Sequence, residues 1–96
     1  MIYQLNTLAN LRRKKLFSKT HNFGYFIEKK LYELNRPQTF IIRKCLLSIG
    51  SIQRWKKGQA PSLLTFIIVC WQISIEEKVD TQQTIIEAIE FILGDV

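Results

Sequence analysis

The chain has little of the chemistry that enzymes and metal centres require. Its 96 residues contain one histidine, His21, and two cysteines, Cys45 and Cys70, which form no CxxC pair. Zinc sites take clustered Cys and His ligands, so no metal is expected. The chain also lacks a glycine-rich phosphate loop, an acidic cluster suited to a catalytic cleft, and any residue assignable as base or nucleophile. We therefore expect no enzyme and no cofactor, with both thiols reduced and partly buried in a cytosolic protein.

Long hydrophobic runs are also missing. The most apolar stretch, residues 63–75, contains Gln72 and is too short to cross a bilayer. At the start of the chain the leucines come first and the basic run Arg12-Arg13-Lys14-Lys15 follows them, which is the reverse of a secretory signal. These features predict a cytoplasmic protein without a membrane partner.

Acidic residues are scarce in the first part of the chain. Residues 1–58 hold thirteen of the fourteen Lys and Arg residues against two acids, a net charge of +11. Residues 59–96 hold one lysine against six acids, a net charge of −5, and the two parts add to +6. This asymmetry predicts a polyanionic partner for the first part and a different role for the second. A solvated surface with a chance bias is the alternative.

Apolar residues recur at helical spacing, and no convincing strand alternation is present, so an all-α fold is expected. The first predicted helices cover residues 3–17, with Leu5, Leu8, Leu11 and Leu16, and residues 23–34, capped by Thr20 or Asn22. A further helix is opened by Pro61-Ser62 and has an apolar stripe that includes Leu63 and ends at Ile73. Ser74 to Glu77 has the spacing of a capping box and predicts a short helix there. A last helix follows Asp80 or Thr81.

Two short helices joined by a tight turn are expected in the middle of the chain. The first covers residues 38–45 and the second covers residues 49–57. Leu46-Leu47 is expected to make the turn, Ser48 to cap the second helix, and Gly58 to occupy its C′ position. Ile52 and Trp55 are expected to face the core, while the opposite face is polar and cationic, as in a helix that lies in a DNA groove.

Residues 23–79 resemble the Cro/lambda-repressor-type helix-turn-helix domain of the XRE family of bacterial and phage regulators. The residues that carry the resemblance are Gln38, Ser48…Ser51-Ile52…Arg54-Trp55…Gly58, Pro61-Ser62-Leu63…Thr65-Phe66 and the hinge from Ile73 to Glu77. The resemblance implies a five-helix domain that binds double-stranded DNA sequence-specifically as a homodimer. It further implies a nucleoid-associated transcriptional repressor without a small-molecule ligand. Residues 1–22 then form an N-terminal basic helical extension, and residues 80–96 a C-terminal apolar helix.

The chain departs from the family pattern at several positions. Pro37 replaces the usual small polar residue, and Phe40 occupies a position that is normally exposed and acidic. Leu46 stands where the turn usually has glycine. Ile49 and Gly50 stand where many relatives carry polar, base-contacting residues. Sequence recognition is therefore expected to depend on few polar contacts.

The resemblance also implies roles for individual residues. The helix over residues 49–57 is expected to enter the major groove. Its expected base contacts are Ile49, Gly50, Ser51 and Arg54. Arg54 is the strongest of these, because a guanidinium group matches O6 and N7 of guanine in a bidentate contact. The expected phosphate contacts are Gln38, Arg36, Arg43, Lys44, Lys56, Lys57 and Gln59.

Three questions stay open at this point. The run Arg12, Arg13, Lys14 and Lys15 is a DNA arm, a helix face lying along the backbone, or a solvated basic stretch. The last helix, with Ile85, Ile86, Ile89, Ile92 and Leu93, forms a dimer interface, which we favour, or packs on the N-terminal leucine helix. The whole chain is alternatively a protein-interaction adaptor or antitoxin-like module. That alternative would use the apolar residues Phe40, Leu47, Ile49, Ile67, Ile68 and Trp71 and would bind DNA only nonspecifically.

Overall fold

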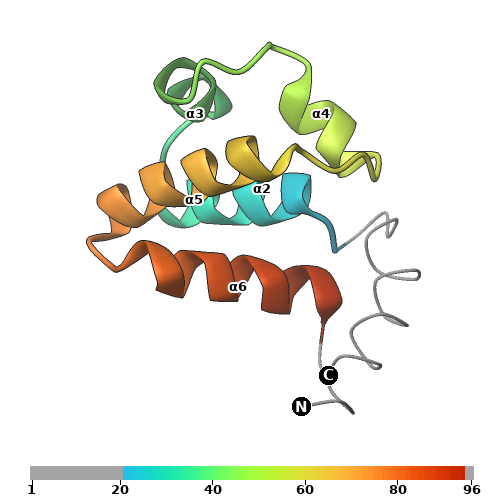
Figure 1. Ribbon diagram of the computed structural model, residues 1–96. Helices are drawn as coiled ribbons and strands as arrows, with labels where there is room; N and C mark the ends of the chain where they lie inside the picture. The colour runs from blue at the N-terminus through green and yellow to red at the C-terminus, as the bar shows by residue number, and fades with distance from the viewer. Residues whose placement is uncertain (1–20, 95–96) are drawn as a thin grey trace.

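Five α-helices make up residues 21–94, the part of the chain that this computed structural model describes (Figure 1). The helices are α2 (Phe23–Glu33), α3 (Gln38–Lys44), α4 (Ser51–Lys56), α5 (Leu63–Glu77) and α6 (Thr81–Leu93). No strand occurs within this range, so the predicted all-α class is confirmed. The helix predicted over residues 3–17 and the basic run at residues 12–15 lie outside the described residues.

The helices pack in layers around one core. α2 and α5 lie in the middle, α3 and α4 cover one side of them, and α6 packs on the other side (Figure 1). Every helix contributes to the buried core: Phe23, Phe26, Ile27, Leu31, Ile41, Ile52, Trp55, Val69, Cys70, Ile73, Ala88 and Ile92. The inward placement of Ile52 and Trp55 on α4 is confirmed. α4 is thereby held on the side of the molecule opposite α6.

Local backbone signals set the ends of α2. The side chain of Asn22 accepts a hydrogen bond from the backbone N–H of Tyr25 at 3.1 Å, so Asn22 is the N-cap. At the other end Asn35 takes a left-handed conformation, with φ of 55°. The N–H of Arg36 then donates to the carbonyl of Leu31 at 2.9 Å, which closes the last turn. Pro37 follows in an extended conformation as the N-cap of α3.

The turn between α3 and α4 lies where it was predicted, but α4 begins later. Leu46 takes the left-handed conformation, with φ of 54°, and the N–H of Leu47 donates to the carbonyl of Ile42. The prediction that Ser48 caps α4 is wrong, because Gly50 is the N-cap and makes no side-chain cap bond. The hydroxyl of Ser48 instead shares a hydrogen bond with the hydroxyl of Ser51 at 2.7 Å. Gly58, with φ of 104°, ends α4 as predicted.

The predicted helix start at Ser74 is also wrong. Ser74 is buried inside α5, which runs without interruption to Glu77. Its hydroxyl donates to the carbonyl of Trp71 at 2.6 Å and lies 3.1 Å from the hydroxyl of Thr81. A serine inside a helix is commonly satisfied by a preceding carbonyl in this way. The chain turns only at Lys78, which has φ of 59°, so the local capping signal yields to the continuing apolar stripe.

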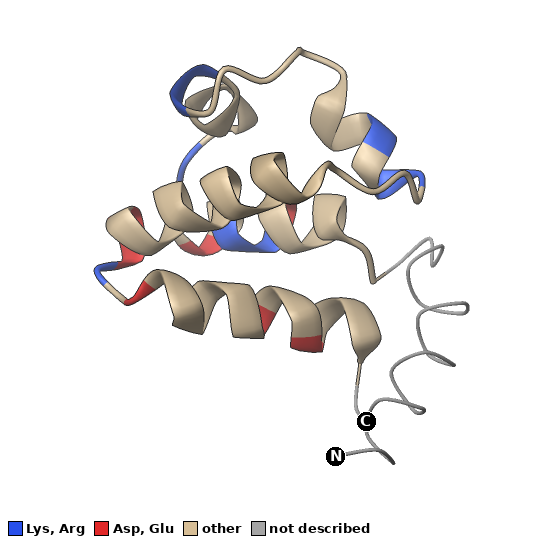
Figure 2. Ribbon diagram, viewed as in Figure 1, with Lys and Arg blue, Asp and Glu red and all other residues tan. Residues whose placement is uncertain are grey.

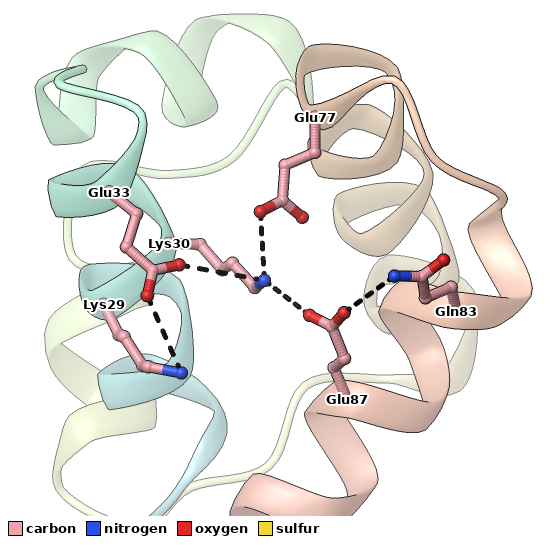
Figure 3. Close-up of polar contacts among 6 residues, drawn as sticks. All are labelled: Lys29, Lys30, Glu33, Glu77, Gln83 and Glu87. Carbon is pink, nitrogen blue, oxygen red and sulfur yellow. Dashed lines mark hydrogen bonds and ion pairs between the residues drawn. The ribbon is translucent and has the colours of Figure 1, made fainter.

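The buried side chain of Lys30 joins α2, α5 and α6 (Figure 3). Nζ of Lys30 on α2 lies 3.0 Å from a carboxylate oxygen of Glu77 on α5 and 2.5 Å from one of Glu87 on α6. Burial lowers the pKa of Lys30, but hydrogen bonds to Glu87 and Glu77 outweigh it, so this pKa is raised overall. The same bond from Lys30 lowers the pKa of Glu87. α6 is therefore fixed to α2 and α5 by charge as well as by apolar contact.

Both cysteines are free thiols in this structure. Cys70 is fully buried, and burial raises the pKa of its thiol to about 12. Cys45 is partly buried at the end of α3, and burial raises its pKa as well. Neither thiol has the lowered pKa that a reactive cysteine requires.

Candidate nucleic-acid interface

The position of α4 depends on a close backbone approach to α2. Ile52 and Trp55 of α4 point into the core, where the ring of Trp55 lies 5.3 Å from the ring of Phe23. Next to Phe23, a Cβ atom at Gly24 would lie 2.4 Å from the backbone nitrogen of Lys56. Only glycine lets the two helices approach this closely. The sequence prediction did not identify this requirement.

Asn22 joins the start of α2 to the end of α4. While its side-chain oxygen caps α2, its Nδ2 group donates to the backbone carbonyl of Lys56 at 2.9 Å. This bond satisfies a carbonyl in the last turn of α4, which has no partner within that helix. A helix of six residues is marginal by itself, so its orientation rests on these contacts with α2.

The residues exposed on and around α4 differ in part from those predicted. Ile49 is 86% exposed at the turn before the helix, and Arg54 is exposed on it. Ser51 is buried, with 7% exposure, so its predicted role as a base contact does not fit its position. Gln53 is exposed next to Arg54 and was missed. Its helical position, on the face opposite the inward-facing Ile52 and Trp55, could have predicted that Gln53 is exposed. Its amide group, which can pair with adenine, could have predicted a base contact.

The guanidinium group of Arg54 is held by the turn that precedes α4. Its Nη2 atom donates to the hydroxyl of Ser48 at 2.8 Å and approaches the hydroxyl of Ser51 at 3.3 Å. A Cβ atom at Gly50 would lie 2.9 Å from Nη1 of Arg54. Gly50 therefore gives room to the arginine, and the two serines orient it. Arg54 has no carboxylate partner among residues 21–94.

Positive charge collects at the end of the molecule formed by α3 and α4 (Figure 2). From Leu34 to Ile75 the chain has no acidic residue. The same stretch contains six cations: Arg36, Arg43, Lys44, Arg54, Lys56 and Lys57. The acidic residues of the described chain lie on α2, at the end of α5, at the start of α6 and along it (Figure 2). The charge asymmetry of the sequence thus becomes a separation in space, with α4 at the cationic end.

Two of the six cations form ion pairs with glutamate side chains of the same domain. Lys56 lies 2.6 Å from a carboxylate oxygen of Glu28 and 5.0 Å from the centre of the Tyr25 ring. Arg36 lies 3.5 Å from a carboxylate oxygen of Glu76, and its guanidinium group stacks over the ring of Phe40 at 5.0 Å. Phe40, unexpected at its position in the sequence, therefore supports a cation.

The other residues predicted to contact phosphate differ from these two in their exposure and in their ion pairs. Arg43, Lys44 and Lys57 are exposed, and none of them forms an ion pair with any residue from 21 to 94. Gln59 is exposed in the loop that follows α4, whereas Gln38 is partly buried as the first residue of α3. The three free cations and Gln59 are therefore the accessible members of the predicted set.

The residues of the predicted dimer interface on α6 fall on different faces. Ile92 is buried in its own chain, and Ile85 and Leu93 are partly buried. Ile86 and Ile89 are the exposed members of the set. α5 carries a longer exposed stripe, formed by Leu64, Ile67, Trp71 and Ile75. The sequence named Ile67 and Trp71 only for the adaptor alternative, and it did not identify Leu64 and Ile75. These four residues recur at helical spacing, and α5 carries no charged residue until Glu76.

Comparisons of this chain with models of protein families, with curated proteins and with solved structures find no match. None of the helices between residues 21 and 94 combines the length and the apolar character needed to cross a membrane. Within the same range no group of His, Cys, Asp or Glu side chains is arranged to hold a metal ion.

Proposed function

We propose that this chain is a sequence-specific, double-stranded DNA-binding regulator of the repressor type, with α3 and α4 as its helix-turn-helix. The observation that carries the proposal is the guanidinium group of Arg54. It is exposed at the cationic end, has no carboxylate partner among the described residues, and is oriented by Ser48 and Ser51. A preoriented arginine loses less side-chain freedom on binding, so it suits bidentate recognition of guanine.

In this proposal α4 lies in the major groove. Arg54 and Gln53 contact base edges, since their side-chain groups match guanine and adenine. The exposed apolar side chain of Ile49 packs on a thymine methyl group. Arg43, Lys44 and Lys57 bind phosphates on either side, and this contribution is the same for every sequence.

The proposed regulator binds as a dimer through α5. The stripe of Leu64, Ile67, Trp71 and Ile75 is a larger exposed apolar face than Ile86 and Ile89 offer on α6. Because residues 63–75 carry no charge, two copies can pack this face together about a two-fold axis without repulsion. Sedimentation of Trp71→Glu beside Ile86→Glu tests the choice. If only Trp71→Glu dissociates the dimer, the interface lies on α5. If only Ile86→Glu does so, the interface lies on α6.

The test of the function is selection of bound sequences from random duplex DNA, followed by affinity measurements on the selected and a scrambled duplex. We expect an enriched sequence whose advantage over the scrambled duplex falls about 10- to 100-fold in Arg54→Ala. Lys78→Ala is the matched control, because Lys78 is an exposed cation in the turn between α5 and α6. Binding of equal strength to both duplexes would contradict the proposal.

A protein-interaction module is the second candidate, and a specific observation favours it. Leu46 and Ile49 are 91% and 86% exposed, so two large apolar side chains face solvent in the turn whose Ser48 orients Arg54. In an adaptor, these side chains would bind an apolar surface of another protein. The selection experiment separates the candidates, because an adaptor of this kind binds DNA weakly and without sequence preference.

A further inference from the structure

Two large aliphatic side chains stand in solvent on the connection between α3 and α4. Leu46 is 91% exposed and Ile49 is 86% exposed, more than any other aliphatic side chain among the described residues. The connection runs along the outer edge of the molecule, on the side away from α6 (Figure 1). The core of the domain therefore takes up neither side chain.

Leu46 is also held in a backbone conformation that disfavours leucine. Its φ of 54° lies in the left-handed region, which glycine adopts without strain and a side chain with Cβ does not. Little packing within the domain offsets this strain, because the side chain is exposed. Strained residues of this kind concentrate at functional sites. We therefore expect the side chain of Leu46 to have a contact outside the domain.

Unpaired positive charge lies beside these two side chains. Arg43 and Lys44 precede Leu46 by three and two positions, and Arg54 is bonded to Ser48 of the same connection. The three cations are exposed, and none of them forms an ion pair with a residue from 21 to 94. The sequence has no acidic residue from 34 to 75. This surface therefore attracts an anionic partner.

We propose that this end of the domain binds the surface of an anionic lipid bilayer. Leu46 and Ile49 insert among the lipids, and Arg43, Lys44 and Arg54 lie at the phosphate headgroups. A bilayer offers negative charge at its surface and an apolar layer directly beneath it, so it matches both kinds of side chain.

Other anionic partners match this surface less well. DNA presents phosphates and thymine methyl groups, but it has no apolar layer into which a whole aliphatic side chain could insert. A protein partner forms a stable interface when about 800 Å² is buried on each side, and two side chains on one connection supply only a part of that area. Insertion into a bilayer needs no matching shape, so two apolar side chains and nearby cations suffice.

The expectation that the chain has no membrane partner rests on the lack of a spanning run. Binding at the surface of a bilayer needs no such run. Bilayer binding goes beyond the proposed function, because it gives the cationic end a second partner. It does not depend on that function either, since vesicles test it in the absence of DNA.

The test is flotation of the full chain with vesicles of equal parts phosphatidylglycerol and phosphatidylcholine, beside vesicles of phosphatidylcholine alone. We expect binding to the anionic vesicles only. Leu46→Gly and Ile49→Ser should each weaken this binding about 3- to 10-fold, because each removes an inserted apolar side chain. Lys44→Ala should weaken it about fivefold, through the loss of one cation at the anionic surface.

Two features of the variants keep the test free of folding effects. Leu46→Gly relieves the strained backbone, so weaker binding of this variant cannot come from unfolding. Ile86→Ser is the matched control for Ile49→Ser, because Ile86 is a 56% exposed isoleucine on α6. Lys78→Ala is the matched control for Lys44→Ala, as an exposed cation in the turn before α6. Neither control should change the binding.

The proposal is overturned if the anionic vesicles do not bind the chain, or if they bind Leu46→Gly and Ile49→Ser as tightly as the unaltered chain. The second result would show attraction by charge alone, for which the basic run at residues 12–15 suffices. An equal loss in Ile86→Ser would assign insertion to another face and also overturn it. Equal binding to phosphatidylcholine alone would do the same, because the cations would then have no role.

Discussion

Arg54 donates a hydrogen bond from Nη2 to the hydroxyl of Ser48 at 2.8 Å, across the turn that leads into α4. The two residues are six positions apart, and Gly50 between them provides the space for the guanidinium group. Ser48 is therefore a positioning residue for Arg54, although its sequence position suggests a helix cap. If the proposed function holds, this relationship predicts how Ser48 affects DNA binding.

Ser48→Ala should weaken binding to the selected duplex about 3- to 10-fold, the equivalent of one hydrogen bond of about 1 kcal/mol. Binding to a scrambled duplex should change little, because the proposed phosphate contacts do not involve Ser48. Fluorescence anisotropy with both duplexes measures the difference. Gln82→Ala, an exposed change on α6, serves as the control. An equal loss on both duplexes would show that Ser48 supports the fold of the turn and not the reading of bases.

Lys56 and Lys57 are neighbours in sequence but should behave differently. Lys57→Ala should reduce the slope of log affinity against log salt by about 0.9 for each phosphate that the lysine no longer neutralises, with little effect on stability. Lys56→Ala should instead lower the free energy of unfolding by about 1 kcal/mol, since Lys56 pairs with Glu28 in a partly buried position. Titrations across salt and urea unfolding separate the two effects. Equal changes of the salt slope in both variants would contradict this division.

Leu46→Gly should stabilise the protein. Leu46 holds a left-handed backbone conformation at φ of 54° while its side chain is 91% exposed, so the conformation is strained and the side chain gains little from packing. Relief of the strain, less the larger entropy of glycine in the unfolded chain, should raise the free energy of unfolding by about 0.5–1 kcal/mol. Leu46→Ala removes the same side chain but keeps Cβ, and it should bring no gain. Thermal unfolding of both variants measures the contrast.

Acid should destabilise the protein partly through Glu87. Because Lys30 lowers the pKa of Glu87, the stability from this carboxylate is present above its ordinary value of 4.5 and is lost as pH falls through the lowered value. Lys30 has a raised pKa, so its contribution is present below 10.5 and is lost as pH rises through the raised value. Stability should therefore have a plateau between these limits.

Urea unfolding of Glu87→Gln checks the acid side of this plateau. At pH 7 the variant should be about 1–2 kcal/mol less stable, since Lys30 loses a charged hydrogen-bond partner. Between pH 7 and pH 3 it should lose less stability than the unaltered chain. Glu90→Gln, an exposed change on the same helix, should follow the unaltered chain. If the stability of Glu87→Gln fell with pH in parallel with that of the unaltered chain, Glu87 would not contribute to the acid destabilisation.

Much of the fold followed from local patterns. The helix predicted over residues 23–34 and the helix start predicted at Pro61-Ser62 are both real features, because each depends on signals within one or two turns of backbone. The errors at Ser48 and Ser74 have a common reason. A serine hydroxyl can accept a hydrogen bond from a backbone N–H at the start of a helix, share one with a neighbouring side chain, or donate one to a preceding carbonyl. These bonds are similar in strength, and the surrounding packing selects among them.

The amino-acid sequence by itself determined that the described chain is helical, where most of its helices begin and end, and that cations gather in one stretch and acids in another. Tertiary structure decided which cations stay free, since the partners of Lys56 and Arg36 are 28 and 40 positions away in Glu28 and Glu76. It also decided that Gly24 must lack a side chain, because only packing brings α2 onto α4. Helix formation rests on neighbours within about four residues. The choice of exposed side chains rests on contacts between residues far apart in the chain, and local periodicity carries no information about those.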